Sequence, residues 1–563
     1  MKKIRSSVFL QGLLFCMAGS VMLLLSVWFL WGWIKDDAYI SFRYSRHLAA
    51  GLGLVFNAGE RVEGYTNFLW VIIMALVHTL GMDMVLASKI LGALAALASL
   101  SVLLLMEKQS SRDELPPLFG LSVLFMGAST TLGVWSSSGL ATAPFLLFSL
   151  AGIHLLLHDD EEKRKNLRSM AAAALLAVSA LFRPEGHLVA AIAYAVVLNR
   201  WRAGRWNART AVTWCIVPLV ILLPYHLWRY MYFGDILPNT YYVKAGGGGA
   251  AFALGMKYLW AMLNFNFNGP MLLLAVAGLF NRRVSAESRV VSGVIIFSFM
   301  SYLVYIGVDE MKYFRLFLTA LPFMYFLAVR GVELIGQKWS LLRKRFVAVP
   351  IVLVIALTVT GLNARENWEK RSMRSSIMAS NRSHAALGMY VSKHSSEGEY
   401  VIFQDMGNMP WAAPKMRFID PIGLVDRTVA HTFKKYGYHP FMKSFIRRSA
   451  EGRKRYAALA AEMRDYMLSR KPEWTGFVAY VPPDRQRETR RILHEYPDDP
   501  SPLTYYITHY DKFTFELFAD PRFQHEYHFV KMYRRSNKYY LVLYERNDHV
   551  RPEKKKRSRK EKN

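Results

Sequence analysis

The sequence has little cysteine and lacks the compact motifs of soluble hydrolases and of His/Cys metal centres. Cys16 and Cys215 are its two cysteines, and both lie in apolar runs, so no disulfide framework indicates a compartment. No cluster of His and Cys has the spacing of a zinc site, and no Gly-x-Ser-x-Gly nucleophile elbow is present. The sequence therefore gives no support to soluble hydrolase chemistry.

Negative charge is also scarce. Asp and Glu number 42 against 71 Lys and Arg, which gives a formal net charge of +29. A large share of the basic residues lies in short loops between apolar runs and in the tail 554–560. This distribution is typical of membrane topology and of an anionic membrane surface. We therefore expect membrane lipids, and no nucleic acid, among the partners.

Apolar residues are abundant: they make up 53% of the chain and are concentrated in runs before Leu362. A spanning helix needs about 20 mainly apolar residues. The candidate spans are 8–33, 84–106, 118–134, 140–158, 171–182, 188–198, 211–228, 270–280, 290–306, 316–329 and 346–362. We therefore predict a polytopic α-helical membrane protein with about 11 transmembrane helices and further juxtamembrane helices, one of them over 65–80.

Loop charge predicts the direction of insertion. Lys2, Lys3 and Arg5 precede the first apolar run, which is too long for a cleaved signal and which we interpret as a retained signal anchor. Loops that would share this side, such as 107–114 and 159–168, hold most of the Lys and Arg of the membrane half. We expect a bacterial cytoplasmic (inner) membrane protein whose N-terminus is cytoplasmic.

Three parts follow along the chain. Residues 1–362 form the transmembrane domain, and 363–548 mix strand-like runs such as "GFVAYV" with the helical run "YAALAAEMRDYML". This pattern predicts a soluble α/β domain on the periplasmic, extracytoplasmic side, which either binds an acceptor or serves as a stabilising cap. The basic tail 549–563 is expected to be disordered.

Two adjacent carboxylates follow the first span. Asp36 and Asp37 are either caps of a following amphipathic helix, which the helix dipole would favour, or acids with a catalytic role. On that helix Tyr39 and Arg43 share a polar face. A divalent cation, if one is bound, would have Asp36 and Asp37 as its ligands.

Other predicted outer segments combine acids, cations and aromatic residues. In "RPEG", Arg183 and Glu185 either pair at membrane depth or belong to a plain hairpin turn. Polar and aromatic groups of the kind in "FGDILPNTYYVK" suit a sugar or a phosphate, and Arg315 of "VDEMKYFR" either faces a phosphate or pairs with Asp309. The further candidate residues in these segments and in the first outer loop are Glu63, Asn239, Tyr241 and Lys244.

These motifs, in this order and at these spacings, resemble the GT-C superfamily of polyprenyl-phosphate-sugar-dependent membrane glycosyltransferases, and within it the branch of the mycobacterial terminal arabinofuranosyltransferase. The resemblance covers the membrane half and extends weakly into "VIFQDMGNMPWAAPKMRFIDPIGLVD". It departs from the family at residues 139–142, where related sequences read Gly-Leu-Glu-Thr and this chain reads Gly-Leu-Ala-Thr. The missing acid leaves the identity of the substrate open.

The resemblance implies a GT-C fold and an inverting glycosyltransferase. Its donor would be a polyprenyl-phosphate sugar, and its acceptor a glycan or a lipid-linked glycan of the cell envelope. The acidic motif of the family falls on Asp36 and Asp37, with Asp36 expected as the base that takes the acceptor proton. The other implied roles are phosphate binding by Arg183, Lys244 and Arg315, and substrate binding by Tyr39, Arg43, Glu63, Glu185, Asn239, Tyr241 and Asp309.

Another function class stays open from the sequence. A transporter or flippase of a lipid-linked sugar would also have buried charges and interrupted spans. The two halves of the chain show no corresponding interrupted segments, which counts against a transporter. The sequence names neither the sugar nor the acceptor.

Overall fold

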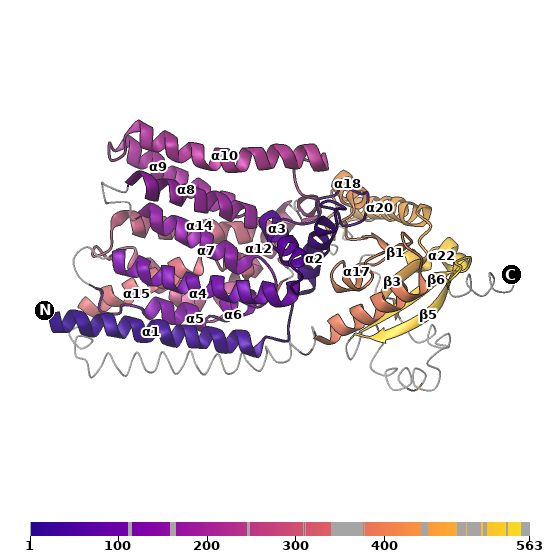
Figure 1. Ribbon diagram of the computed structural model, residues 1–563, viewed down its shortest axis with the longest axis horizontal. Helices are drawn as coiled ribbons and strands as arrows, with labels where there is room; N and C mark the ends of the chain where they lie inside the picture. Colours follow the sequence, from indigo (N-terminus) through magenta and orange to yellow (C-terminus); the bar gives the residue numbers. More distant parts are fainter. Residues whose placement is uncertain are drawn as a thin grey trace.

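The computed structural model describes two packed parts, a bundle of helices and a mixed sheet with its own helices (Figure 1). The described residues are 2–110, 115–157, 165–244, 248–307, 309, 311–338, 375, 378–440, 449–480, 491, 508–509, 515–535 and 539–552. In Figure 1 the N-terminus and the sheet lie at opposite ends of the bundle.

All the regular elements described in the first part are helices. Its elements are α1 (Lys2–Phe29), α2 (Asp36–Ala49), α3 (Phe68–Thr79), α4 (Met84–Ser110), α5 (Leu121–Ala128), α6 (Thr130–Ser136), α7 (Thr142–Leu157), α8 (Lys165–Phe182), α9 (Gly186–Arg202), α10 (Ala208–Phe233), α11 (Asn239–Lys244), α12 (Gly248–Leu263), α13 (Asn268–Gly278), α14 (Ala286–Ile306), the 3-10 helix η2 (Arg315–Phe317) and α15 (Leu321–Lys338). The long helices run side by side along the bundle, and α2 and α3 lie between it and the sheet (Figure 1).

Several of these helices suit a bilayer. Among the described residues, four are long and apolar enough to cross a membrane: Val8–Phe29, Met84–Ser110, Ala208–Phe233 and Ala286–Ile306. A fifth candidate is the pair Ala251–Leu263 and Asn268–Gly278, which is bent by 86°. The multi-pass membrane character is therefore confirmed. The count of about 11 spans stays a prediction.

Two predicted spans differ from the structure, and a third cannot be compared. The span 118–134 is not one helix, because Ser129 is extended (φ −64°, ψ 123°) between α5 and α6. The span 316–329 begins later than expected, since η2 precedes the start of α15 at Leu321. The predicted span 346–362 lies outside the described residues.

Glycine lets two helices of the bundle approach closely. Gly278 of α13 faces Leu327 of α15, and Gly331 of α15 faces Leu274 of α13. A Cβ atom on either glycine would overlap the facing carbonyl oxygen. Because lipid offers helices little hydrophobic drive to associate, close backbone packing at small residues is a main source of their attraction.

Within the described residues, the second part contains a six-stranded mixed sheet. Its strands are β1 (Tyr400–Ile402), β2 (Arg417–Ile419), β3 (Trp474–Tyr480), β4 (Thr508–His509), β5 (Tyr527–Arg534) and β6 (Tyr539–Arg546), in the order β2-β1-β3-β6-β5 with β4 beside β3. β1 pairs in parallel with β2 and β3, and the other pairs are antiparallel. Its helices are α17 (Asn408–Ala412), α18 (Arg427–Tyr436), α20 (Ala450–Ser469), η7 (Leu517–Ala519) and α22 (Pro521–Glu526), and residues 378–394 are also helical.

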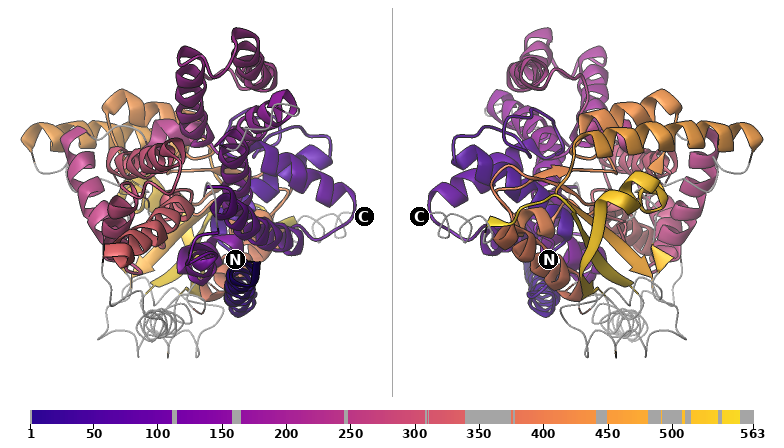
Figure 2. Two further views of the ribbon diagram at one scale, coloured as in Figure 1. Left: turned by 90° about the vertical axis from the view of Figure 1, so that its left-hand side faces the viewer. Right: turned by 90° about the vertical axis from the view of Figure 1, so that its right-hand side faces the viewer.

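Alternation along the strands gives the sheet two buried faces. Phe477 and Ala479 of β3 pack in one core with residues of α18 and α20, which flank the strands in Figure 2. Trp474 and Val478 point to the opposite face, because successive side chains of a strand alternate. Tyr44 of α2 belongs to that second core, so the sheet and the membrane half share packed apolar side chains.

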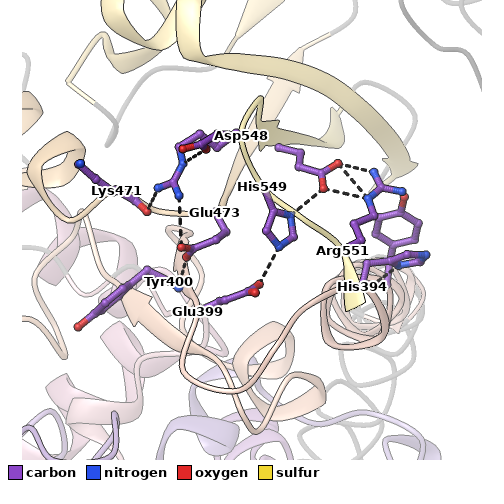
Figure 3. Close-up of polar contacts among 11 residues, drawn as sticks. His394, Glu399, Tyr400, Lys471, Glu473, Asp548, His549 and Arg551 are labelled. Atoms are coloured by element: carbon purple, nitrogen blue, oxygen red, sulfur yellow. Dashed lines mark hydrogen bonds and ion pairs between the residues drawn. The ribbon is translucent and has the colours of Figure 1, made fainter. Parts of the chain in front are cut away.

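A cluster of charged residues lies at one end of the sheet (Figure 3). His549 lies between two carboxylates, with Nε2 3.1 Å from Glu399 and Nδ1 2.7 Å from Glu545. The Arg551 guanidinium also pairs with Glu545. Although burial acts to lower it, the two carboxylates raise the pKa of His549 to about 9.

Candidate active site

The carboxylate of Asp36 contacts the second part of the chain, which contains the sheet. Its Oδ1 accepts a hydrogen bond of 2.9 Å from the backbone N–H of Asn408. Gly407 lies so close that a Cβ atom there would overlap the carbonyl oxygen and Oδ2 of Asp36. The Asp36 side chain is still 25% exposed, so a substrate hydroxyl can reach it.

The carboxylate of Asp37 lies near other groups than the carboxylate of Asp36 does. Lys35 Nζ lies 3.5 Å from Asp37 Oδ2, and Lys244 and Arg315 are close enough to act on its charge. Successive residues of an α-helix are about 100° apart around the axis, since the helix has about 3.6 residues per turn. Asp36 and Asp37 therefore contact separate groups, and the adjacent acids form two microenvironments.

The two acids titrate in opposite directions. Burial raises the pKa of Asp36, and the nearby Asp405 carboxylate adds to this effect. Burial acts in the same direction on Asp37, but the charge of Lys35, followed by Lys244 and Arg315, lowers the pKa of Asp37 below its ordinary value. Neighbouring carboxylates with diverging pKa values are a feature of acid–base sites.

Three predicted cations from separate loops belong to one charged group, in which Lys244 and Arg315 act on Asp37 and Arg183 acts on Lys244. Arg183 pairs with Glu185 at 2.6 Å, and Arg315 pairs with Asp309 at 2.8 Å. The charge of Arg315 acts on Asp37, Lys244 and Glu185. Both local pairs expected from the sequence therefore exist within a larger charged group.

Lys244 is the least compensated cation of this group. Within the part of the chain that the structure describes, its Nζ forms no ion pair, whereas Arg183 and Arg315 each have a carboxylate. Burial, followed by the charge of Arg315, lowers the pKa of Lys244. An anion that binds here would therefore interact more favourably with Lys244 than with the paired Arg183 and Arg315.

The soluble part holds the helix that carries Lys244. Asn239 Nδ2, at the start of α11, donates to Gly423 O at 2.5 Å and to Asp426 O at 2.9 Å. His439 Nε2 lies 2.9 Å from the carbonyl oxygen of Lys244, at the end of α11. Asn239, predicted to bind substrate, is thus placed in the contact between the two parts.

Arg43 and Glu63 also lie in structural contacts. The Arg43 guanidinium is 1% exposed and donates to four backbone carbonyl oxygens, those of Phe56, Pro410, Ala413 and Met416. Glu63 pairs with Arg229 at 2.5 Å in a buried position. These bonds tie α2 and the first outer loop to neighbouring segments.

The two predicted tyrosines lie in different settings. Tyr39 is half-buried beside Asp36 and packs against Trp411 of the soluble part, with ring centroids 6.0 Å apart. Burial and the Asp36 charge raise the pKa of Tyr39 to about 12. Tyr241 is 43% exposed; its ring centroid lies 6.2 Å from that of Tyr242, and its hydroxyl group interacts with Tyr305.

Sequence reasoning missed several groups beside the acids. Lys35 directly precedes the pair, and His384, Asp405 and Asn408 come from the soluble part. Asp405 and Asn408 lie in "VIFQDMGNMPW", and the weak family resemblance over this stretch was the only sequence signal for them. His384 lies outside every quoted motif.

Asp36 and Asp37, the expected ligands of a divalent cation, contact different groups, because Asp36 Oδ1 accepts from the Asn408 N–H while Asp37 Oδ2 lies beside Lys35 Nζ. Within the described residues, no three His, Cys, Asp or Glu side chains form a group that could hold a metal ion.

Comparisons with known proteins identify a family model and two curated relatives. A family model described as a domain of unknown function (DUF8728) matches residues 371–544. The terminal β-(1→2)-arabinofuranosyltransferases of Mycobacterium tuberculosis and Corynebacterium glutamicum are 29% and 26% identical in alignments of 264 residues, which cover 44% and 42% of this chain. The matches cover 40% and 36% of those proteins, so this chain aligns with about two fifths of the length of its curated relatives.

A solved structure matches over nearly the whole chain. The apo oligosaccharyltransferase of Archaeoglobus fulgidus aligns with a TM-score of 0.54 and 10% identity, covering 93% of this chain and 80% of that one. The chain therefore shares the fold of this oligosaccharyltransferase. Its sequence is similar to the terminal arabinofuranosyltransferases, so the resemblance predicted from its motifs is confirmed.

Proposed function

We propose that the chain is an inverting glycosyltransferase that transfers a sugar from a polyprenyl-phosphate donor to a glycan or glycolipid of the cell envelope. The N-terminus would lie in the cytoplasm, and the sheet would lie on the outer face of the cytoplasmic membrane, as loop charge suggests. Residues 1–362 would form the catalytic domain, and 363–548 the extracytoplasmic domain.

One observation carries this proposal: a half-buried carboxylate that can take a proton lies next to a carboxylate held among cations. Burial raises the pKa of Asp36, so this group is suited to accept a proton. Asp37 stays ionised beside Lys35, Lys244 and Arg315. A proton acceptor and an anion site are thus adjacent in the chain.

The transfer step follows from these roles. Asp36 takes the proton of the acceptor hydroxyl as its oxygen bonds to the anomeric carbon. The bond from that carbon to the phosphate oxygen breaks, and its electron pair leaves with the phosphate. Attack from the face opposite the phosphate inverts the anomeric centre, and a base in this role contributes roughly 10²- to 10⁴-fold in rate.

The cations stabilise the departing phosphate. Lys244 makes the first contact, because it has no ion pair to give up among the described residues. Arg315 and Arg183 strengthen the field while remaining paired with Asp309 and Glu185. Interactions that grow with the charge of the leaving group lower the barrier more than they strengthen donor binding.

The donor and acceptor enter from different sides in this proposal. The polyprenyl chain would approach laterally from the bilayer, and the acceptor would reach Asp36 along the junction where Tyr39 meets Trp411. Aromatic rings of this kind suit sugar faces. Arabinofuranose is the first donor sugar to test, because the named relatives transfer it. No step uses a metal ion.

The deciding experiment incubates purified protein in nanodiscs with radiolabelled polyprenyl-phosphate sugars, arabinofuranose first, and membrane glycan acceptors. We expect covalent transfer with inverted stereochemistry that is lost in Asp36→Asn. Movement of intact donor across proteoliposomes without transfer to any acceptor would instead establish the flippase alternative.

A further inference from the structure

His384 lies between two carboxylates at the contact of the membrane and soluble parts. It belongs to the helical segment 378–394, and its side chain is 2% exposed. Nδ1 is 3.9 Å from Asp36 Oδ1, and Nε2 is 3.1 Å from Asp405 Oδ2. The buried imidazole thus faces Asp36, the proposed base, with Nδ1 and Asp405 with Nε2.

The ring is fixed from several sides. Arg535 Nη1, at the end of β5, lies 3.2 Å from the Asp405 oxygen that His384 faces. Phe403 packs edge-on against the imidazole, with ring centroids 5.6 Å apart. Neither ring nitrogen has an aligned hydrogen-bond partner, so charge and packing hold the ring in this place.

The segment that carries His384 is docked to the start of α2. Asn381 Nδ2 donates to Ile34 O at 3.2 Å, and Asn408 Nδ2 donates to Asn381 O at 2.7 Å. Asn408 also binds Asp36 through its backbone N–H. The imidazole and the Asp36 carboxylate are therefore held by one network.

We propose that His384, oriented by Asp405 and Arg535, is a positioning residue that keeps Asp36 ionised and aimed at the acceptor hydroxyl. The proposal rests on the proposed glycosyltransferase function and adds that the soluble part completes the active site. The ring is placed to act on both carboxylates, because Nε2 lies 3.1 Å from Asp405 Oδ2 while Nδ1 faces Asp36 Oδ1 at 3.9 Å.

The charges around Asp36 explain why it needs such a partner. Asp37 on the same helix and Asp405 on the facing loop both oppose the ionisation of Asp36, as burial does, whereas His384 and the Asn408 N–H favour it. Arg535 faces Asp405, and Lys35 faces Asp37. Without His384, the base would hold its proton to higher pH.

The test compares His384→Gln with His394→Gln in the full-length protein. His394 lies in the same helical segment, where its Nδ1 contacts the Tyr390 carbonyl oxygen, and it serves as a matched control. We expect His384→Gln to lower kcat by about 10-fold with little change in acceptor KM, and to move the acidic limb of the kcat/KM profile up by about one pH unit. His394→Gln should retain the wild-type profile.

Two results would overturn the inference. A normal rate in His384→Gln, or a reduced rate with an unmoved acidic limb, would show that His384 has no part in the ionisation of Asp36. Asp36→Asn is measured alongside: if that variant still transfers sugar, the proposed function itself fails. An inactive Asp36→Asn with a wild-type His384→Gln rejects the inference alone.

Discussion

Asp36 and Asn408, 372 positions apart in the chain, are joined by a 2.9 Å hydrogen bond from the Asn408 backbone N–H to the Asp36 carboxylate. The donor is a backbone group, so the bond depends on the path of the chain at Gly407 and Asn408 more than on their side chains. The proposed base is thereby fixed at the contact between the two parts.

Asp36→Asn should reduce sugar transfer by roughly 10²- to 10⁴-fold, because it removes the base while keeping its size. Asp37→Asn should lower the rate less and weaken donor binding more, since Asp37 organises Lys35, Lys244 and Arg315. Turnover, donor affinity and the melting temperature of each variant check this. Full activity in Asp36→Asn together with loss in Asp37→Asn would reassign the base.

Gly407→Ala should impair both folding and transfer, because the added Cβ would overlap Asp36. Steric insertion of this kind costs about 1 to 3 kcal/mol of stability. Gly336→Ala is the matched control, since it lies in α15 with no atom within 4 Å of an added Cβ. Equal melting temperatures for the two variants would show that the contact between Gly407 and Asp36 accommodates the added Cβ atom without loss of stability.

Lys244→Gln should reduce turnover more than donor affinity, because the cation acts on charge that develops in the transition state. A charge-assisted hydrogen bond contributes about 1.5 to 3 kcal/mol, so we expect a loss of about one to two orders of magnitude in rate. Lys244→Arg should retain part of the activity. Wild-type rates in both Lys244→Gln and Arg315→Gln would remove these residues from the phosphate site.

Arg183→Gln carries a different expectation. It would leave the buried carboxylate of Glu185 without its partner at 2.6 Å, so the variant should lose stability as well as rate. The double variant Arg183→Gln/Glu185→Gln should recover part of the melting temperature without recovering activity. Full recovery of both would confine this pair to a structural role.

The stability of the soluble part should fall at alkaline pH. Glu399 and Glu545 raise the pKa of His549 from 6.5 to about 9, so the charged imidazole stabilises the folded state fully below about pH 6.5. This contribution is lost as the pH rises through 9. Thermal unfolding of His549→Gln should show a smaller decline between pH 6.5 and 9.5 than the wild type, and parallel curves would contradict the assignment.

Labelling of introduced cysteines tests the orientation. In a background lacking Cys16 and Cys215, a cysteine at Glu397 or Glu451 should react with an impermeant thiol reagent added outside the cell, whereas one at Ala203 should not. Glu397 and Glu451 are 76% and 73% exposed on the soluble part, and Ala203 is exposed at the end of α9. The opposite pattern would reverse the proposed topology.

The sequence by itself determined the membrane class, the candidate spans and the residue types of the site. Apolar runs and loop charge are local properties of a chain in a bilayer, so they can be recognised without a structure. The pairs Arg183–Glu185 and Arg315–Asp309 were also within reach, since the partners are two and six positions apart.

The tertiary structure alone decided how these groups are used. It separated Asp36 from Asp37, buried Arg43 among backbone carbonyls and brought His384 and Asp405 to the proposed base. Helical periodicity gives the angle between neighbouring side chains but not the partner that each will meet. That partner depends on the packing of α2 against segments more than 300 residues away, and the free energy of that packing is spread over the whole shared core.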